Sequence, residues 1–342
     1  MMSQSTQMRQ EILEIPDAVE RLLTRGSDGV QAAANAAREL DPRLLVSVAR
    51  GSSDHACTYL KYASELVLRR PMASVGPSVA SIYGAELASQ GALCLAVSQS
   101  GRSPDIVQMT RSLAEGGGLT IAITNDPTSD LARVAEWTLP IYAGPELSVA
   151  ATKTLVTSMV AGLWLIAELK QDTELLRAIN ALPAQLAAAT ECDWSEAAKS
   201  VTGQSLFTLG RGPSWAVSNE AALKFKETCL IHAESYSSAE VLHGPVSIVE
   251  PGFPVIGFAA GDAAEDSLVE VADALADKGG QVFVTSDRAR RARALPHIRT
   301  NHWLTDPIAA IVSFYGMVER VALARGINPD APRHLKKVTE TL

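Results

Sequence analysis

Two groups of residues in this 342-residue chain could do chemistry. The first is the run Ser98-Gln99-Ser100-Gly101-Arg102-Ser103-Pro104, which follows an apolar segment and precedes a helical pattern. Serine hydroxyls, backbone N–H groups and the positive end of a helix would meet there, with Ser103 as N-cap, and together they could bind a phosphate. A plain capped turn is the alternative, and the run by itself does not separate the two.

The second group is Glu220, Lys224 and Glu227, whose i, i+4, i+7 spacing puts all three on one face of a helix. The pattern predicts that this helix starts just after Gly212 and that its first turns border the carboxyl edge of a sheet. Glu220 could then hold Lys224 and leave Glu227 free as a proton acceptor. The alternative is a solvent-exposed ladder of ion pairs, which is common on helix surfaces.

Two single residues deserve comparison with these groups. His243 lies in the turn Leu242-His243-Gly244-Pro245, where a histidine is usually a bystander, although imidazole suits proton transfer near neutral pH. Lys337 stands beside Lys336 near the end of the sequence. A basic pair in a tail is ordinarily solvated, and the pair alone indicates no chemistry.

An internal repeat predicts the elements that must position these residues. The segment 45–56 matches 206–217, and 118–126 matches 279–287, both at an offset of 206 − 45 = 161 residues. Each copy alternates short apolar runs with helical patterns, which predicts parallel strands buried on both faces. We therefore expect an α/β protein with two tandem domains, each a doubly wound parallel sheet flanked by helices.

The repeat also distinguishes the two copies chemically. At the same offset, residues 98–101 fall on Ala259-Ala260-Gly261-Asp262, where the hydroxyls are lost and a carboxylate would repel phosphate. The first copy is therefore predicted to bind the anion, at the carboxyl ends of its strands. Ser53, at the end of the first strand, is expected to face the same crevice, and it could also cap the helix that begins near Asp54, since the two roles are compatible.

Around these sheets the pattern predicts helices over 7–40, 151–170, 173–190 and 306–325. The expected organisation is a helical segment at 1–40, a first phosphate-binding domain at 41–170, a helical linker at 171–200, a second domain at 201–326 and a tail at 327–342.

Composition narrows the class of protein. The net charge of −8 offers no basic face for nucleic acid, although one phosphate can still be held locally. No signal peptide, membrane span or metal-spaced cysteine pair is evident, so we expect a cytoplasmic protein without metal, membrane or nucleic-acid partner.

Taken together, these motifs resemble those of SIS domains, the sugar isomerase family. Ser98-Gln99-Ser100-Gly101, with Arg50-Gly51-Ser52-Ser53, is similar to the family's phosphate signature. The segments 220–227, 231–236, 240–245 and 332–337 resemble the isomerase half of glucosamine-6-phosphate synthase. The resemblance implies two tandem SIS domains and an enzyme without a cofactor.

The resemblance also implies a role for each matching residue. Glu227 corresponds to the base that moves a proton between C1 and C2, and His243 to the ring-opening residue, which the neighbouring subunit of a homodimer contributes. Lys337 corresponds to the lysine that forms an imine with the ketose. Substrate or phosphate contacts are implied for Ser53, Ser98, Gln99, Ser100, Ser103 and Val149, with Glu220 and Lys224 beside the base.

Departures from the synthase pattern point to a narrower activity. The sheet begins near Leu44, and no glutaminase or N-terminal cysteine precedes it here; Arg102 stands where the synthase has an acidic residue. The pattern Ser103-Pro104 resembles the SIS-type deaminases. We expect a deaminase of glucosamine 6-phosphate that releases ammonia and fructose 6-phosphate. The alternatives are an aminotransferase-like isomerase, a deaminase or deglycase of another amino-sugar phosphate, and a non-catalytic sugar-phosphate sensor.

Overall fold

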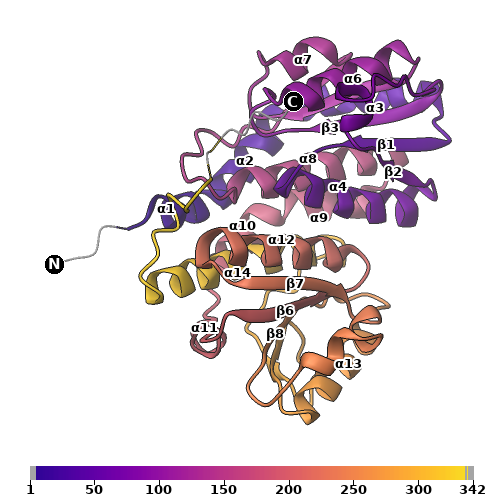
Figure 1. Cartoon of the computed structure of the whole chain (residues 1–342). Helices are drawn as coiled ribbons and strands as arrows, with labels where there is room; N and C mark the ends of the chain where they lie inside the picture. The colour runs from indigo at the N-terminus through magenta and orange to yellow at the C-terminus, as the bar shows by residue number, and fades with distance from the viewer. Residues whose placement is uncertain (1–4, 336, 338–342) are drawn as a thin grey trace. The chain divides into compact units, whose positions relative to one another are not determined.

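The protein is described by a computed structural model that covers residues 5–335 and 337. These residues form two units, each built around one sheet (Figure 1). Of the described residues, 17–146, 153–180 and 337 belong to the first-sheet unit, and 5–16, 147–152 and 181–335 belong to the second-sheet unit.

Both sheets have five parallel strands in the same order. The first runs β2-β1-β3-β4-β5 and the second β7-β6-β8-β9-β10, so every strand has a counterpart at the same place in the other sheet. This confirms the predicted duplicated, doubly wound α/β fold. The strands are β1 (Leu44–Val48), β2 (Met72–Ser74), β3 (Ala92–Val97), β4 (Leu119–Thr124), β5 (Trp137–Pro140), β6 (Ser205–Gly210), β7 (His232–Ser237), β8 (Pro254–Gly257), β9 (Gln281–Val284) and β10 (Arg293–Ala294).

In the first-sheet unit, helices cover both faces of the sheet. Figure 1 shows α6 and α7 on one face and α4 and α8 on the other. Alternate strand residues such as Val46, Cys94 and Ala122 pack under α6 because side chains of a strand point to opposite faces in turn. The helices are α2 (Ile15–Arg25), α3 (Ser27–Leu40), α4 (Ser52–Ala63), the π-helix η1 (Ser64–Leu68), α5 (Ser78–Ser81), α6 (Pro104–Glu115), α7 (Asp130–Val134), α8 (Lys153–Lys170) and α9 (Thr173–Asn180).

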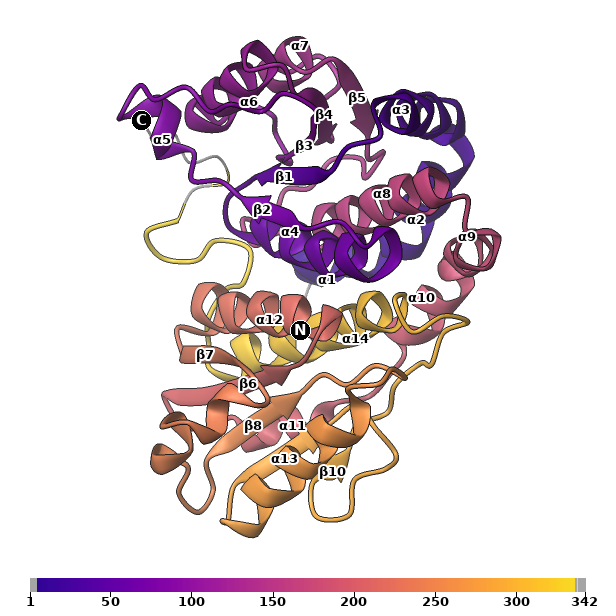
Figure 2. The same ribbon diagram turned by 90° about the vertical axis from the view of Figure 1, so that its right-hand side faces the viewer.

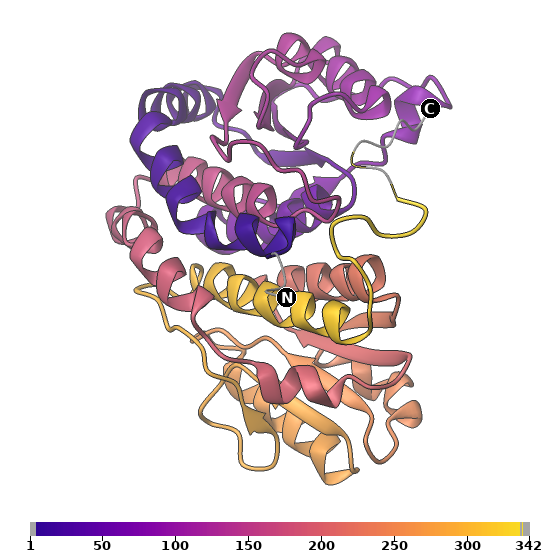
Figure 3. The same ribbon diagram turned by 90° about the vertical axis from the view of Figure 1, so that its left-hand side faces the viewer.

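The second-sheet unit repeats this layering. Figure 2 shows α12 and α14 along one face of the sheet and α13 on the other, and Figure 3 shows α14 as a long yellow helix next to α12. Phe207, Leu209 and Val255 form the core under α13 with Leu268 and Leu275. The helices are α1 (Gln7–Leu13), α10 (Leu182–Thr190), α11 (Ser195–Ser200), α12 (Pro213–Cys229), η2 (Glu240–Leu242), η3 (Pro245–Ile248), α13 (Glu265–Asp277) and α14 (Asp306–Ala324).

The structure differs from the prediction in the helices between residues 173 and 190. The single helix predicted over 173–190 is wrong, because α9 and α10 are separated at Ala181, where Pro183 follows in the first turn of α10.

Among the described residues, α14 alone is long and apolar enough to cross a membrane by composition. Because 78% of its apolar stretch is buried, α14 is the core helix of its unit.

The backbone carries the same duplication as the strands. Gly51, before α4, has φ 56° and ψ −133°, and Gly212, before α12, has φ 58° and ψ −138°. The two glycines are 161 residues apart, and this conformation is open only to glycine at little cost. Each strand-to-helix turn at this place in the fold therefore depends on a glycine.

Candidate functional site

The predicted phosphate-binding run forms the turn between β3 and α6, residues 98–103, which we call the phosphate turn. Ser103 is the N-cap of α6 and Pro104 follows in its first turn, as predicted. The Ser98 and Ser100 hydroxyls accept hydrogen bonds from the backbone N–H groups of Gly101 and Arg102, at 3.2 and 3.3 Å. Each hydroxyl can still donate its own proton, so the turn can offer O–H groups to an anion at a helix N-terminus.

Neighbouring loops fix the shape of the phosphate turn. The Asn125 N–H donates to the carbonyl of Gln99 at 3.1 Å, and the Leu131 N–H donates to that of Gly101 at 3.0 Å. Gly101 has φ +63°, and a Cβ atom there would lie 2.1 Å from the Ser129 Oγ. Only glycine therefore fits both the backbone conformation and the space.

The duplicated turn, residues 259–262, is filled by the protein's own side chains. The Asp306 carboxylate accepts a hydrogen bond from the Gly261 N–H at 2.8 Å, in the place where an anion would contact the backbone. Arg299 donates to the Ala259 carbonyl at 3.0 Å and pairs with Glu265. In the second copy, the Gly261 N–H is thus already hydrogen-bonded to the Asp306 carboxylate. This contact supports the prediction that only the first copy binds phosphate.

Ser53 lies in the first turn of α4, at the carboxyl end of β1, but it does not cap that helix. The N-cap is Gly51, and α4 begins at Ser52 rather than near Asp54. The capping expectation is therefore wrong, and the phosphate contact of Ser53 stays a prediction. Just after β1, the Arg50 Nε donates to the buried Asp105 carboxylate at 2.5 Å, and this ion pair connects the end of β1 to the first turn of α6. Nothing in the spacing of the sequence pointed to that pair.

Glu220, Lys224 and Glu227 form a buried charge cluster on α12, so a solvent-exposed ladder is the wrong interpretation. Glu220 and Lys224 are fully buried, and Glu227 is 21% exposed. The Lys224 Nζ lies 3.3 Å from Glu220 and is also paired with Glu227, which is therefore not free as expected. Burial alone would lower the pKa of Lys224, but the two carboxylates outweigh it and raise that pKa.

The arrangement still allows Glu227 to take a proton. With Lys224 charged and both glutamates ionised, the cluster has a net charge of −1. Protonation of Glu227 leaves it neutral, because Glu220 and Lys224 then form a neutral ion pair. A charged lysine that is buried without a carboxylate partner would destabilise the protein. Glu220 prevents this when Glu227 is protonated, because it stays paired with Lys224. The sequence argument placed the first turns of α12 at the carboxyl edge of the sheet and assigned no position to Glu227. Glu227 lies in the last turn of α12, which has returned to the amino edge where parallel β7 begins.

His243 and Val149 are the other predicted site residues in the second-sheet unit. His243 is exposed between η2 and η3, and its N–H donates to the Glu240 carbonyl at 2.9 Å. Val149 is half-buried, and its N–H donates to the Asp330 carbonyl at 3.3 Å. Neither contact engages the histidine ring or the valine carbonyl.

Lys337 lies in the first-sheet unit, at the same end of the sheet as the phosphate turn. Its Nζ is 2.8 Å from a carboxylate oxygen of Glu146. The segment before Glu146 is attached to the end of β4, because the Asn125 side chain donates to the Gly144 carbonyl and accepts from the Ala143 N–H. The structure thus brings the tail lysine and the phosphate residues to one edge, through a glutamate that the sequence did not single out.

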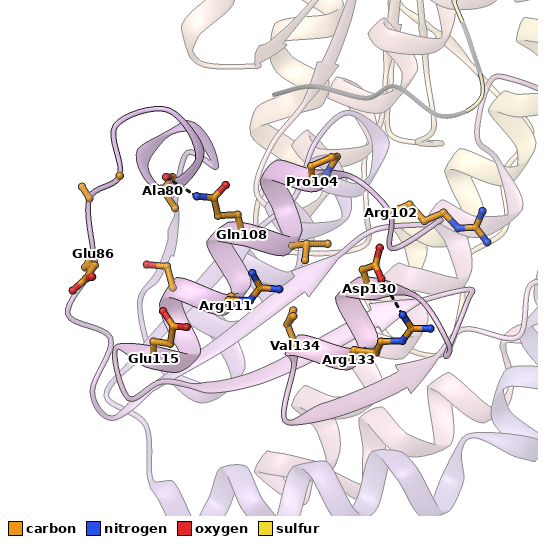
Figure 4. Close-up of a pocket in the computed structure, with 14 residues that line it drawn as sticks. Ala80, Glu86, Arg102, Pro104, Gln108, Arg111, Glu115, Asp130, Arg133 and Val134 are labelled. Carbon is orange, nitrogen blue, oxygen red and sulfur yellow. Dashed lines mark hydrogen bonds and ion pairs between the residues drawn. The ribbon is translucent and has the colours of Figure 1, made fainter.

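A cavity of about 580 Å³ is lined by residues of the segment 80–86, of α6 and of α7 (Figure 4). Its lining includes Arg102 from the phosphate turn, Pro104, Gln108 and Arg111 from α6, and Arg133 from α7. Of the described residues that line it, none is a hydroxyl side chain of that turn. The phosphate contact therefore stays a prediction for the carboxyl edge of the strands, and the hydroxyls on which it rests do not line this cavity.

Residues 5–335 and 337 contain no group of three or more His, Cys, Asp or Glu side chains placed to hold a metal ion. The four cysteines are unpaired thiols, and three of them are buried. Burial raises the pKa of the Cys94 thiol to about 12, so this group stays neutral at ordinary pH.

The two sheets correspond to two copies of one known domain. The SIS domain model matches residues 41–168 and 202–300, which contain the first and the second sheet. The chain belongs to the SIS domain family. The predicted resemblance, on the phosphate turn and the α12 motif, is thereby confirmed at the level of the family.

Among relatives of known sequence, the chain is similar to glutamine–fructose-6-phosphate aminotransferases. The enzyme of Sulfolobus acidocaldarius is 32% identical over 310 residues, which cover 86% of this chain and 49% of the relative. That of Legionella pneumophila is 34% identical over 304 residues, which cover 85% and 50%. The chain therefore spans about half the length of the curated relatives it matches.

Two solved structures are similar to nearly the whole chain. A protein from Silicibacter pomeroyi DSS-3, named as a phosphosugar isomerase, has 62% sequence identity and a TM-score of 0.93, covering 95% of this chain and 100% of that one. Glucosamine-6-phosphate deaminase from Thermotoga maritima has a TM-score of 0.79 at 20% identity, with 98% and 100% covered. The second likeness is one of fold alone.

Proposed function

We propose that this SIS protein is a cytoplasmic phosphosugar isomerase and, more narrowly, a deaminase of glucosamine 6-phosphate. The observation that carries the proposal is the presence of the phosphate turn and Lys337 at one edge of one sheet. A hydroxyl-rich helix N-terminus suits the phosphate, and an amine at the same edge suits imine chemistry at a sugar carbon.

The proposed reaction needs one proton transfer and one hydrolysis. Once the sugar ring is open, a base takes the C2 proton and returns it at C1, which turns the 2-amine into a 2-imine. Water then replaces the imine nitrogen, and ammonia and fructose 6-phosphate are the products. We assign the base to Glu227 and ring opening to His243, contributed by the second subunit of a homodimer. Both assignments rest on the resemblance, and the ion pair of Glu227 with the buried Lys224 supports the first.

The second candidate is an aminotransferase-like isomerase that forms glucosamine 6-phosphate from fructose 6-phosphate. It is favoured by the names of the relatives from Sulfolobus acidocaldarius and Legionella pneumophila. The two candidates share the proton transfer and differ in the nitrogen donor and in the direction of the reaction.

The test is ammonia release from a panel of amino-sugar 6-phosphates with gluco, galacto and fructose-derived skeletons. We expect glucosamine 6-phosphate to give equal amounts of ammonia and fructose 6-phosphate. The Lys337→Ala variant should lose this activity, while alanine at the exposed Lys226 should not. Release from another amino-sugar phosphate alone would replace the substrate, and isomerisation without ammonia would exclude the deaminase.

A further inference from the structure

Glu146 is a buried carboxylate built into the first-sheet unit without a role in the reaction described so far. Its side chain is fully buried. At the start of α8, the Thr154 N–H and hydroxyl donate to its two oxygens at 3.0 and 2.7 Å. Next to it, the Lys153 ammonium donates to the Pro145 carbonyl at 2.6 Å. A helix N-terminus favours a negative charge at this place.

The third contact of Glu146 comes from a residue far away in the sequence. The Lys337 Nζ lies 2.8 Å from its Oε2, although 191 residues separate the two. The lysine is 23% exposed, so the ion pair is largely withdrawn from water. Buried ion pairs add little net stability compared with apolar packing, because both charges lose their hydration. A positioning role explains this ion pair better than a stabilising one, because the pair determines where the Lys337 ammonium lies.

That place is next to the phosphate turn. Asn125 donates its backbone N–H to Gln99 in the turn, and its side chain holds Ala143 and Gly144, two residues before Glu146. One residue therefore ties both the turn and the segment that carries Glu146 to the end of β4. All of these contacts lie within the first-sheet unit.

We propose that Glu146 is the positioning residue of Lys337: it docks the tail lysine beside the bound sugar phosphate and takes the proton that the lysine must lose to attack. The inference rests on the proposed function. Burial would raise the pKa of Glu146, but the Lys337 ammonium and the Thr154 hydrogen bonds outweigh it and lower that pKa. Near neutral pH the carboxylate is therefore ionised and can accept a proton.

The proposed step balances in protons and charge. One proton passes from the Lys337 ammonium through Glu146 to the nitrogen of the 2-imine, while the lysine nitrogen forms a bond to C2. The lysine nitrogen then gives a second proton to the sugar nitrogen, the C2–N bond breaks, and ammonia leaves. Lys337 stays bound to C2 as an iminium, and water releases fructose 6-phosphate and the free lysine.

The first experiment measures the docking without using enzyme activity. Lysines of the native protein are labelled with acetic anhydride, and peptides are quantified by mass spectrometry. Lys337 should react at least about tenfold more slowly than the exposed Lys226, and Glu146→Gln should abolish that protection. The matched control is glutamine at the exposed Glu136 of the same unit, which should change nothing. Equal labelling of Lys337 in the wild type and in Glu146→Gln would overturn the inference.

The second experiment measures the step itself. Wild-type protein with fructose 6-phosphate and cyanoborohydride should give a sugar adduct on Lys337. Glu146→Gln should lower the adduct yield and kcat by about 100-fold, since a misplaced reacting group costs this much, while the Kd of inorganic phosphate stays unchanged. Thr154→Val, which keeps the charge and loosens the carboxylate, should lie between the two. An unchanged adduct yield in Glu146→Gln would contradict the positioning role.

The two experiments separate this inference from the proposed function. If the wild type releases no ammonia and forms no adduct, the deaminase proposal fails, and the labelling result alone decides whether Glu146 docks Lys337. If the wild type is active and Glu146→Gln retains full kcat, the positioning role fails and the deaminase proposal stands.

Discussion

Replacing Gly101 with alanine tests whether the phosphate turn is shaped by the tertiary structure around it. The residue has φ +63°, and an added Cβ would lie 2.1 Å from the Ser129 Oγ, 2.6 Å from its Cβ and 3.1 Å from the Thr124 Oγ1. The left-handed conformation costs about 1–2 kcal/mol for a residue other than glycine. Overpacking of a tight site adds about 1–3 kcal/mol. Together these terms predict that Gly101→Ala destabilises the protein by about 2–5 kcal/mol.

The same change should weaken phosphate binding, because the turn must shift to admit the methyl group. Loss of one hydrogen bond to a charged ligand costs about 1.5–3 kcal/mol, or roughly 10- to 150-fold in Kd. The measurements are urea unfolding and titration with inorganic phosphate by calorimetry.

The matched control is alanine at Gly84, in the same unit. Gly84 has φ +61°, and among the described residues no atom lies within 4 Å of a Cβ built there. Gly84→Ala should therefore show the conformational cost alone, with phosphate affinity unchanged. Adding Ser129→Gly to Gly101→Ala removes the two closest contacts and should recover the packing part of the loss. Equal stability and phosphate affinity of Gly101→Ala and Gly84→Ala would refute the argument.

Five further predictions concern the two turns, the charge cluster on α12 and the proposed reaction. A crystal soaked in phosphate should contain an anion at the phosphate turn and none at the duplicated turn, and density at the latter would contradict the assignment of the repeat. Lys224→Met should lower the free energy of unfolding by about 3–5 kcal/mol, since two buried carboxylates lose their cation; a wild-type-like urea curve would contradict it. Because the folded pKa of Lys224 is raised, its contribution to stability should be complete below the unfolded value of 10.5 and be lost as the pH rises through the folded pKa, as urea titrations in alkaline buffers can show. Glu227→Gln should reduce kcat by ~100-fold and abolish deuterium exchange at C2, which a surface ion pair would not do. Mixed His243→Ala and Ser98→Ala subunits should regain ammonia release if His243 acts across a dimer, and hybrids as inactive as both parents would place it in its own subunit or outside the reaction.

Much of the site could be predicted because its signals are local. The hydroxyls of residues 98–103, the N-cap Ser103 and Pro104 after it specify a strand-to-helix turn within a few residues. The i, i+4, i+7 spacing on α12 likewise specifies which side chains share a face. Residue spacing does not predict whether that face is buried or exposed to solvent. The sequence analysis therefore missed that Lys224 is buried and pairs with two carboxylates. The sequence argument placed only the first turns of α12, and it did not predict that the length of the helix carries Glu227 to the amino edge.

By itself, the sequence determined the fold class, the duplication and the difference between the two turns, since apolar periodicity and a repeat at a constant offset of 161 residues are properties of the order of residue types alone. The tertiary structure alone decided which distant charges meet. Asp306 enters the turn at Gly261, Arg50 reaches Asp105, and Glu146 receives Lys337 from 191 residues away. Each of these contacts depends on how strands and helices pack in three dimensions, and a side chain's type predicts that it needs a partner without predicting which partner the fold provides.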